Sequence, residues 1–295
     1  MPDTEDQRPV IPADWPNADC SMFIHAAGLR WHVQRAGRGP VALLVHGTAG
    51  ASHTWRDVLP RLTPRADVLA VDLPGHGFTT GATPDQLSLH GMTAALADLL
   101  RTLGVAPVIA AGHSAGAAVL LQLASSREVA PRSIIGVNSA LVSLNPLGQL
   151  FLPFSRALAD LAPLRSVVGA VMESGTIARA LLRSTGSTLD PAQEARYVAL
   201  LTSGERVTAA LRMMARWDLP ALVATFPSIV QPVTLIHSRN EPWVPWDDLM
   251  ASTRTLPDRT VVDVTPAGHL IPDEQPARVA AVITAALDAL AARPG

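Results

Sequence analysis

Short apolar runs alternate with longer amphipathic stretches along most of the chain. The runs typical of strands buried on both faces cover residues 41–45, 67–71, 108–111, 134–137, 233–236 and 260–264. Residues 23–25 and 29–34 predict a hairpin that turns near Gly28. Apolar positions at helical spacing predict helices over residues 87–103, 117–123 and 276–292. Strands that alternate with helices favour an α/β fold, with a mostly parallel eight-stranded sheet flanked by helices.

The strand pattern stops between residues 141 and 230. This segment is rich in leucine, alanine and arginine at helical spacing and is interrupted by prolines. We therefore expect a helical cap over 141–230, inserted between two strands of a core formed by 21–140 and 231–295. Residues 1–20 are polar and proline-rich, which predicts an N-terminal arm.

Composition narrows the class of protein. The chain has 295 residues, of which 48% are hydrophobic and 16% charged, and this is long enough for one large α/β domain. A net charge of −2 gives no electrostatic reason to expect nucleic acid. All 23 basic residues are arginine, so no lysine can serve as a Schiff base. Cys20 is the only cysteine, which excludes an internal disulfide and a thiolate-based zinc site.

We find no sequence pattern typical of a targeting segment, a membrane span or a metal site. The N-terminus is acidic and polar, unlike a signal peptide, and no apolar run reaches the roughly 20 residues that span a bilayer. We expect a cytoplasmic protein with no transmembrane segment. The histidines at positions 25, 32, 53, 90 and 237 have no arrangement that suggests metal ligation. We expect neither a metal nor a cofactor.

A serine lies at the apex of a strand–turn–helix pattern. Residues 112–116 have the form G-x-S-x-G, with Ser114 in the middle, and they follow an apolar strand and precede a helix. Such a turn holds its serine in a strained conformation with the hydroxyl exposed. The flanking Gly112 and Gly116 are needed because a Cβ there would collide with the neighbouring strand and helix. Ser114 is our candidate nucleophile.

A serine nucleophile needs a base, and the base needs an orienting carboxylate. His269 follows the last predicted strand and precedes the closing helix, at the end of a parallel sheet where ligand sites collect. Glu241 is the only carboxylate between the preceding strand and Pro245. We therefore expect Ser114, Glu241 and His269 to act as nucleophile, acid and base, in that order along the chain.

The oxyanion formed by serine attack needs backbone N–H donors. The amide of Ala115, directly after the nucleophile, is one candidate. The amide of Thr48, in the loop after the first long parallel strand, is the other, because Gly47 allows that loop to turn tightly.

Other polar residues have simpler interpretations. Asn138, at the end of another strand, could orient a histidine but could not stabilise imidazolium by charge. Asp247 and Asp248 lie near Glu241, where they favour a helix N-terminus. Asp72 precedes the nucleophile along the chain and is expected to order a loop.

Five motifs in fixed order resemble those of the α/β-hydrolase superfamily. They lie at residues 46–48, 72–77, 112–116, 241–245 and 268–269. The resemblance runs from about Gly28 to the C-terminus and implies a serine hydrolase that cleaves an ester-like bond. One departure is Glu241, where members usually carry aspartate. Cofactor-free haloperoxidase chemistry, which uses the same triad, stays open.

A narrower resemblance involves residues 15–17, 28–34, 46–48 and 217–219, which are similar to the magnesium-chelatase accessory family of bacteriochlorophyll biosynthesis. It implies a role beside magnesium insertion, with a porphyrin as a bulky hydrophobic substrate and chelatase subunits as partners. Two functions follow. The first is a hydrolase with a Ser-His-Glu triad acting on a bulky hydrophobic substrate, and the alternative is a non-catalytic accessory protein that binds a tetrapyrrole.

Overall fold

One eight-stranded sheet runs through the computed structural model, which describes residues 11–142 and 175–292. The strands are β1 (Ser21–Ala26), β2 (Leu29–Gly37), β3 (Val41–Val45), β4 (Asp67–Val71), β5 (Ile109–His113), β6 (Ser133–Val137), β7 (Val233–His237) and β8 (Arg259–Asp263). Their order in the sheet is β1-β2-β4-β3-β5-β6-β7-β8. β2 pairs antiparallel with β1 and β4, and the remaining neighbours are parallel. The predicted fold class is confirmed.

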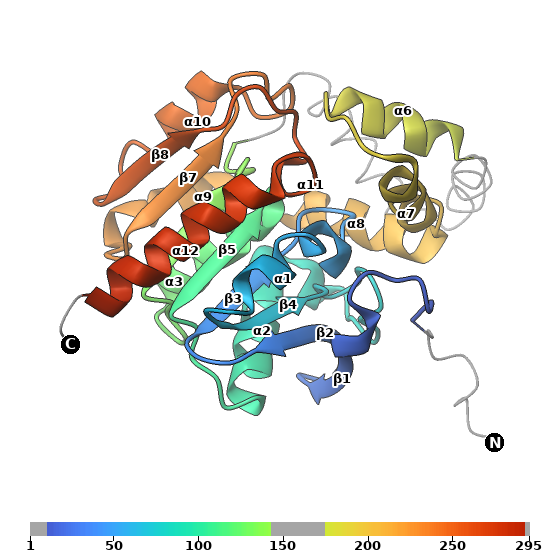
Figure 1. Ribbon diagram of the computed structural model, residues 1–295, viewed down its shortest axis with the longest axis horizontal. Coiled ribbons are helices and arrows are strands. Elements are labelled where there is room, and N and C mark those ends of the chain that lie inside the picture. The colour runs from blue at the N-terminus through green and yellow to red at the C-terminus, as the bar shows by residue number, and fades with distance from the viewer. Residues whose placement is uncertain (1–10, 143–174, 293–295) are drawn as a thin grey trace.

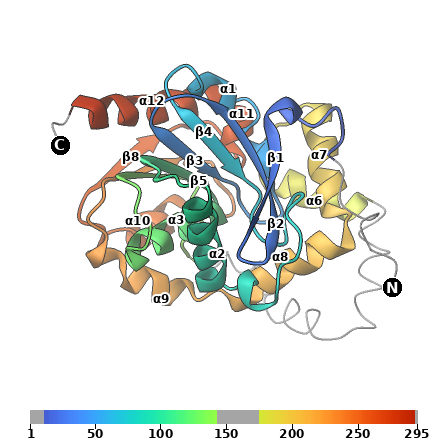
Figure 2. The same cartoon turned by 90° about the horizontal axis from the view of Figure 1, so that it is seen from below.

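Helices lie on both faces of this sheet and beside it. They are α1 (Leu59–Leu62), α2 (Leu89–Thr102), α3 (Ala115–Ser126), α6 (Thr176–Ser184), α7 (Pro191–Leu201), α8 (Gly204–Arg216), α9 (Leu219–Ala224), α10 (Trp246–Ser252), α11 (Ile271–Glu274) and α12 (Pro276–Ala292). Figure 2 shows α1, α11 and α12 on one face and α2, α3, α9 and α10 on the other. The sheet is therefore the middle of three layers.

The alternation of side chains along each strand builds two apolar cores. In β3, Leu43 and Val45 belong to the core shared with α2 and α3, whereas Ala42 and Leu44 belong to the core shared with α12. Successive side chains of a strand point to opposite faces, so a strand covered on both sides must be apolar throughout. This is why the central strands are continuous apolar runs.

The helices between β6 and β7 occupy the region of the predicted cap. Figure 1 shows α6, α7 and α8 beside the sheet, with α9 returning toward it. α7 begins with a capping box, in which Asp190 and Gln193 each accept a hydrogen bond from the other's backbone amide, followed by Pro191 at the first helical position. Residues 143–174 of the predicted cap lie outside the described residues, and its limits at 141 and 230 stay a prediction. We use "cap helices" for α6, α7 and α8.

The described part of the N-terminal segment contacts the body of the protein. Trp15 is buried, with its ring 4.8 Å from that of Phe78 and 5.2 Å from that of His53. The side-chain amide of Gln34 donates to the carbonyl of Pro16 at 2.6 Å. Residues 1–10 of the predicted arm lie outside the described residues. Within residues 11–142 and 175–292, no helix is long and apolar enough to cross a membrane.

Candidate active site

Ser114 occupies a strained turn between β5 and α3. Its backbone has φ 52° and ψ −117°, a conformation that costs free energy for a residue with a Cβ. A Cβ on Gly112 would collide with the backbone of Gly116, and a Cβ on Gly116 would collide with the carbonyl oxygen of Val45. Glycine at both positions therefore lets β5, α3 and β3 approach closely enough to form the turn.

His269 and Glu241 lie together at the carboxyl ends of β8 and β7. The His269 Nδ1 atom is 2.7 Å from Glu241 Oε2, and both side chains are buried. The other carboxylate oxygen, Oε1, accepts from the amides of Trp243 at 2.6 Å and Val244 at 3.3 Å. An ionised carboxylate only accepts hydrogen bonds, so a hydrogen bond to ionised Glu241 is donated by His269 Nδ1.

Ser114 is linked to His269 through its neighbour His113. The His113 Nε2 atom donates to the carbonyl oxygen of His269 at 2.9 Å, and the two rings are 5.0 Å apart. Burial lowers the pKa of His113 to about 3, so its ring is neutral. No hydrogen bond between Ser114 Oγ and His269 Nε2 occurs among the residues that the structure describes. In unliganded enzymes such bonds are often long and tighten only when substrate binds.

The loop of Thr48 passes directly beside Ser114. A Cβ on Gly47 would lie 2.8 Å from the Cβ of Ser114. His46 shapes this loop, because its Nε2 accepts from the Leu73 amide at 2.9 Å and its Nδ1 donates to Gly47 O at 2.7 Å. No acceptor in the described parts of the chain engages the amides of Thr48 or Ala115. Both donors are thus available to an oxyanion.

Asp72 orders the loop after β4 and does not contact His269. Its carboxylate lies 2.7 Å from His32 Nδ1 and accepts from the amides of Ser52 at 2.6 Å and Phe78 at 2.8 Å. Burial alone would raise the pKa of Asp72, but His32 and these hydrogen bonds outweigh it and hold the pKa well below the usual range. The expected loop-ordering role agrees with these contacts.

Asn138 has a larger role at this site than its sequence position indicates. Its Nδ2 donates to the carbonyl oxygens of Gly268 and His269, each at 2.9 Å, and its Oδ1 accepts from the Ser238 amide at 3.4 Å. It therefore holds the backbone of His269 rather than the imidazole. In the sequence, the only indication of this role is that Asn138 is a polar residue directly after a buried strand.

Trp243 is a further neighbour of His269 that sequence reasoning missed. Its ring centroid is 4.8 Å from that of His269, and its Nε1 donates to Ser184 Oγ at 3.3 Å. Ser184 is the last residue of α6, so this tryptophan joins His269 to the cap helices. No group of histidine, cysteine, aspartate and glutamate side chains able to hold a metal occurs in the part of the chain that the structure describes.

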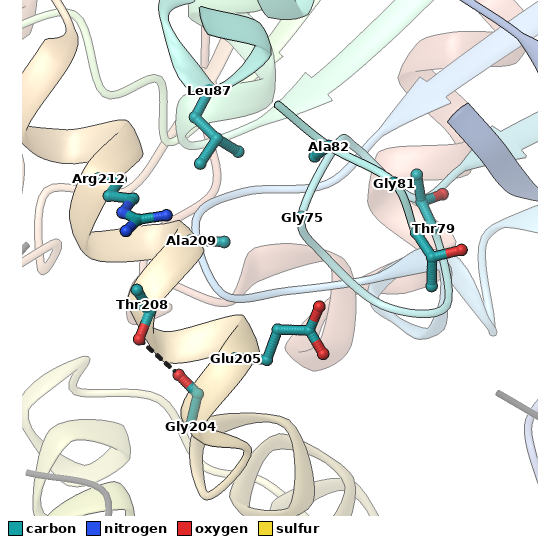
Figure 3. Close-up of a pocket in the computed structure, with 11 residues that line it drawn as sticks. Gly75, Thr79, Gly81, Ala82, Leu87, Gly204, Glu205, Thr208, Ala209 and Arg212 are labelled. Atoms are coloured by element: carbon teal, nitrogen blue, oxygen red, sulfur yellow. Dashed lines mark hydrogen bonds between the residues drawn. The ribbon is translucent and has the colours of Figure 1, made fainter. Parts of the chain in front are cut away.

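A cavity of about 420 Å³ lies between α8 and the loop after β4. Figure 3 shows Arg212 and Glu205 on the α8 side and Thr79 on the loop side. None of the five candidate site residues lines it. Arg212 is a partly buried residue, and its guanidinium has no ion-pair or hydrogen-bond partner within residues 11–142 and 175–292.

Comparison with known proteins decides the family. The model of the "Alpha/beta hydrolase family" matches residues 42–282. The chain belongs to this family. It is 37% identical over 268 residues to the "Magnesium-chelatase 30 kDa subunit" of Rhodobacter capsulatus, covering 89% of this chain and 92% of that protein.

A second relative and a solved structure are also similar to this chain. The chain is 32% identical to "Lipase LipV" of Mycobacterium tuberculosis, covering 87% of this chain and 97% of the lipase. A crystal structure of an α/β hydrolase fold protein from Burkholderia ambifaria superposes with a TM-score of 0.74 at 21% identity, covering 90% of this chain and 97% of that one. This last likeness shows the fold alone.

Proposed function

We propose that the protein is a serine hydrolase that cleaves an ester-like bond with Ser114, His269 and Glu241. The observation that carries the proposal is the 2.7 Å hydrogen bond between His269 Nδ1 and Glu241 Oε2, together with a serine in a strained turn whose neighbour His113 donates to the backbone of His269. A neutral imidazole whose Nδ1–H is held by a buried carboxylate can accept a proton at Nε2 and is stabilised when it becomes charged.

The reaction begins when Ser114 Oγ attacks the carbonyl carbon and His269 Nε2 accepts the hydroxyl proton. The resulting oxyanion accepts hydrogen bonds from the amides of Thr48 and Ala115. As the tetrahedral intermediate collapses, the bond to the alcohol breaks and His269 returns the proton to the departing oxygen. Water, deprotonated by His269, then attacks the acyl-enzyme. The bond to Ser114 Oγ breaks, His269 returns the proton to that oxygen, and the acid and free Ser114 are released.

Glutamate in place of the usual aspartate fits this site. The longer side chain of Glu241 still reaches His269, because the amides of Trp243 and Val244 hold its other oxygen. Its side chain is fully buried, which strengthens the interaction with the imidazolium that forms during the reaction.

For the substrate, we propose a bulky hydrophobic ester in or beside bacteriochlorophyll biosynthesis, with a porphyrin ester as the first choice. The similarity to the Rhodobacter capsulatus subunit supports this setting, and the similarity to the lipase supports an apolar substrate. The same setting makes magnesium-chelatase subunits the proposed partners and the cytoplasm the proposed location. No metal or cofactor is needed for this reaction.

A second candidate function is that of a non-catalytic accessory protein that binds a tetrapyrrole. The same Rhodobacter capsulatus relative favours it. The cavity beside Arg212 also favours it, because a partly buried arginine with no ion-pair or hydrogen-bond partner in the described residues suits the carboxylates of such a ligand.

Ester hydrolysis by the purified protein tests the first function. We expect the wild type to hydrolyse p-nitrophenyl esters and Ser114→Ala to fall to the background rate. Ser126→Ala, at the exposed end of α3, is the matched control and should retain full activity. A folded wild type with no activity toward short- and long-chain esters would contradict the proposal.

Complementation separates the two functions. A strain that lacks the gene and fails to make pigment should be rescued by the wild type but not by Ser114→Ala if catalysis is needed. Full rescue by Ser114→Ala, at normal protein level, would support the binding-only function instead.

A further inference from the structure

The backbone around His269 is hydrogen-bonded to the segment that joins α6 to α7. The His269 amide donates to the carbonyl oxygen of Thr185 at 2.8 Å. The next amide, that of Leu270, donates to the side-chain oxygen of Ser187 at 2.8 Å. Residues 185 and 187 follow α6 directly, so both acceptors come from the chain between the cap helices.

Glu274 joins the same two segments with a single carboxylate. Its Oε2 accepts from the amide of Gly268 at 2.9 Å, and its Oε1 accepts from the amide of Thr188 at 3.1 Å. The backbone amides of residues 268, 269 and 270 therefore all donate hydrogen bonds. Two of the acceptors belong to residues 185 and 187, and the third is Glu274, which also accepts from the Thr188 amide.

Close packing accompanies these hydrogen bonds. A Cβ on Gly268 would collide with the backbone of Gly186 and Ser187, so the two segments touch without an intervening side chain. Gly186 has a φ of +68°, which glycine adopts readily, and this turns the segment over the loop of His269.

The opposite side of the same backbone is bound by the sheet. The carbonyl oxygens of Gly268 and His269 accept from Asn138, and that of His269 also accepts from His113. The peptide groups that carry the His269 imidazole thus lie between the ends of β5 and β6 on one side and residues 185–188 on the other.

We propose that Ser187 and Glu274 are positioning residues that align His269 as the catalytic base by fixing its loop to residues 185–188. This inference deepens the proposed function and rests on it. The direction of Nε2 depends on the backbone as well as on Glu241, and small misplacements of a catalytic group slow a reaction strongly. The segment between α6 and α7 is consequently part of the support of the active site, in addition to any contact with substrate.

Two variants remove these contacts individually. Ser187→Ala deletes the acceptor of the Leu270 amide, and Glu274→Ala deletes the acceptor of the amides of Gly268 and Thr188. Ser187→Thr keeps the hydroxyl and is the conservative rescue. Thr188→Ala is the matched control, because the Thr188 side chain is exposed and only its backbone amide is engaged.

The first measurement is hydrogen–deuterium exchange of the full-length protein over residues 266–272, and it needs no catalytic activity. We expect at least tenfold faster exchange in Ser187→Ala and Glu274→Ala, with wild-type exchange in Ser187→Thr and Thr188→Ala. Protection in the central strands should stay unchanged. Wild-type exchange over residues 266–272 in both variants would overturn the inference.

The second measurement is hydrolysis of a p-nitrophenyl ester, with kcat and KM determined separately. We expect kcat to fall about tenfold in Ser187→Ala with little change in KM, and Ser187→Thr to restore it. Faster exchange with unchanged kcat in an active protein would overturn the positioning role. A wild type that hydrolyses no ester would refute the proposed function and, with it, this catalytic role, even where exchange shows that the loop is anchored.

Discussion

Asn138 donates its side-chain amide to the carbonyl oxygen of His269 at 2.9 Å, although 131 positions separate the two residues along the chain. Asn138 directly follows β6, with a φ of 41°, and His269 follows β8. The parallel sheet brings the two strand ends to one edge, where the asparagine can hold the backbone of the proposed base. This contact makes Asn138 the first residue to test outside the proposed triad.

Asn138→Asp keeps the shape of the side chain and removes the donor. The two carbonyl oxygens of Gly268 and His269 would then face a carboxylate, so we expect the free energy of unfolding to fall by about 1–3 kcal/mol. Ester hydrolysis should fall as well. Urea denaturation and kcat measure these effects, with the exposed Asn240→Asp as control. Unchanged stability and activity would show that the contact is dispensable.

Glu241 tests the carboxylate of the proposed triad. Glu241→Gln removes the charge that stabilises protonated His269, so we expect kcat to fall by about 10²–10⁴-fold. Glu241→Asp shortens the side chain by one methylene and should break the 2.7 Å hydrogen bond to His269, with a smaller loss of activity. Asp248→Asn, an exposed carboxylate on α10, is the control. Equal activity of Glu241→Gln and wild type would exclude Glu241 as the acid.

Buried histidines make the protein sensitive to acid. Burial lowers the pKa of His53, His76 and His113 to about 3, whereas a histidine of the unfolded chain titrates near 6.5. Between these values the unfolded chain binds more protons than the folded one, so stability falls as the pH is lowered from about 6.5 toward 3. At pH 5 each of the three should reduce the free energy of unfolding by about 2 kcal/mol.

His53→Phe tests one of these contributions. Neither ring nitrogen of His53 has a hydrogen-bond partner in the described chain, and the ring packs edge-on against Tyr197 at 4.4 Å. Replacement by Phe should lessen the loss of stability between pH 7.5 and pH 5 by about 2 kcal/mol, measured by urea denaturation at both pH values. Replacement of the exposed His90 by Gln should leave that loss unchanged. An identical pH dependence in His53→Phe and wild type would contradict this prediction, because it would mean that His53 is protonated in the folded protein at pH 5 as it is in the unfolded chain.

Local pattern predicts the sheet well because each central strand must be apolar on both faces. The runs at 41–45 and 67–71 coincide with β3 and β4. The last strand begins one residue earlier than expected and ends at Asp263, whose carboxylate accepts from the amide of Thr265 and so turns the chain out of the sheet. Such a turn depends on a side-chain contact that hydrophobic pattern does not encode.

The candidate site is predictable to the extent that it follows strand ends. Ser114 directly follows β5, and Glu241 and His269 lie in the loops after β7 and β8. These three strands run parallel, so chain order brings the three residues to one edge of the sheet. The contacts of Ser187 and Glu274 depend on how residues 185–188 fold over that edge. Apolar residues at helical spacing in the cap predict helices, but this spacing does not predict which backbone amides the segments between those helices will bind.

The most direct test of the central claim is the reaction of the purified protein with a fluorophosphonate, followed by intact mass and peptide mapping. Nucleophilic Ser114 predicts one adduct per chain, located in the peptide that contains residues 112–116, and none in Ser114→Ala. The exposed-serine variant Ser126→Ala should be labelled like the wild type. A folded wild-type protein that stays unlabelled, or one labelled at a residue other than Ser114, would contradict the account.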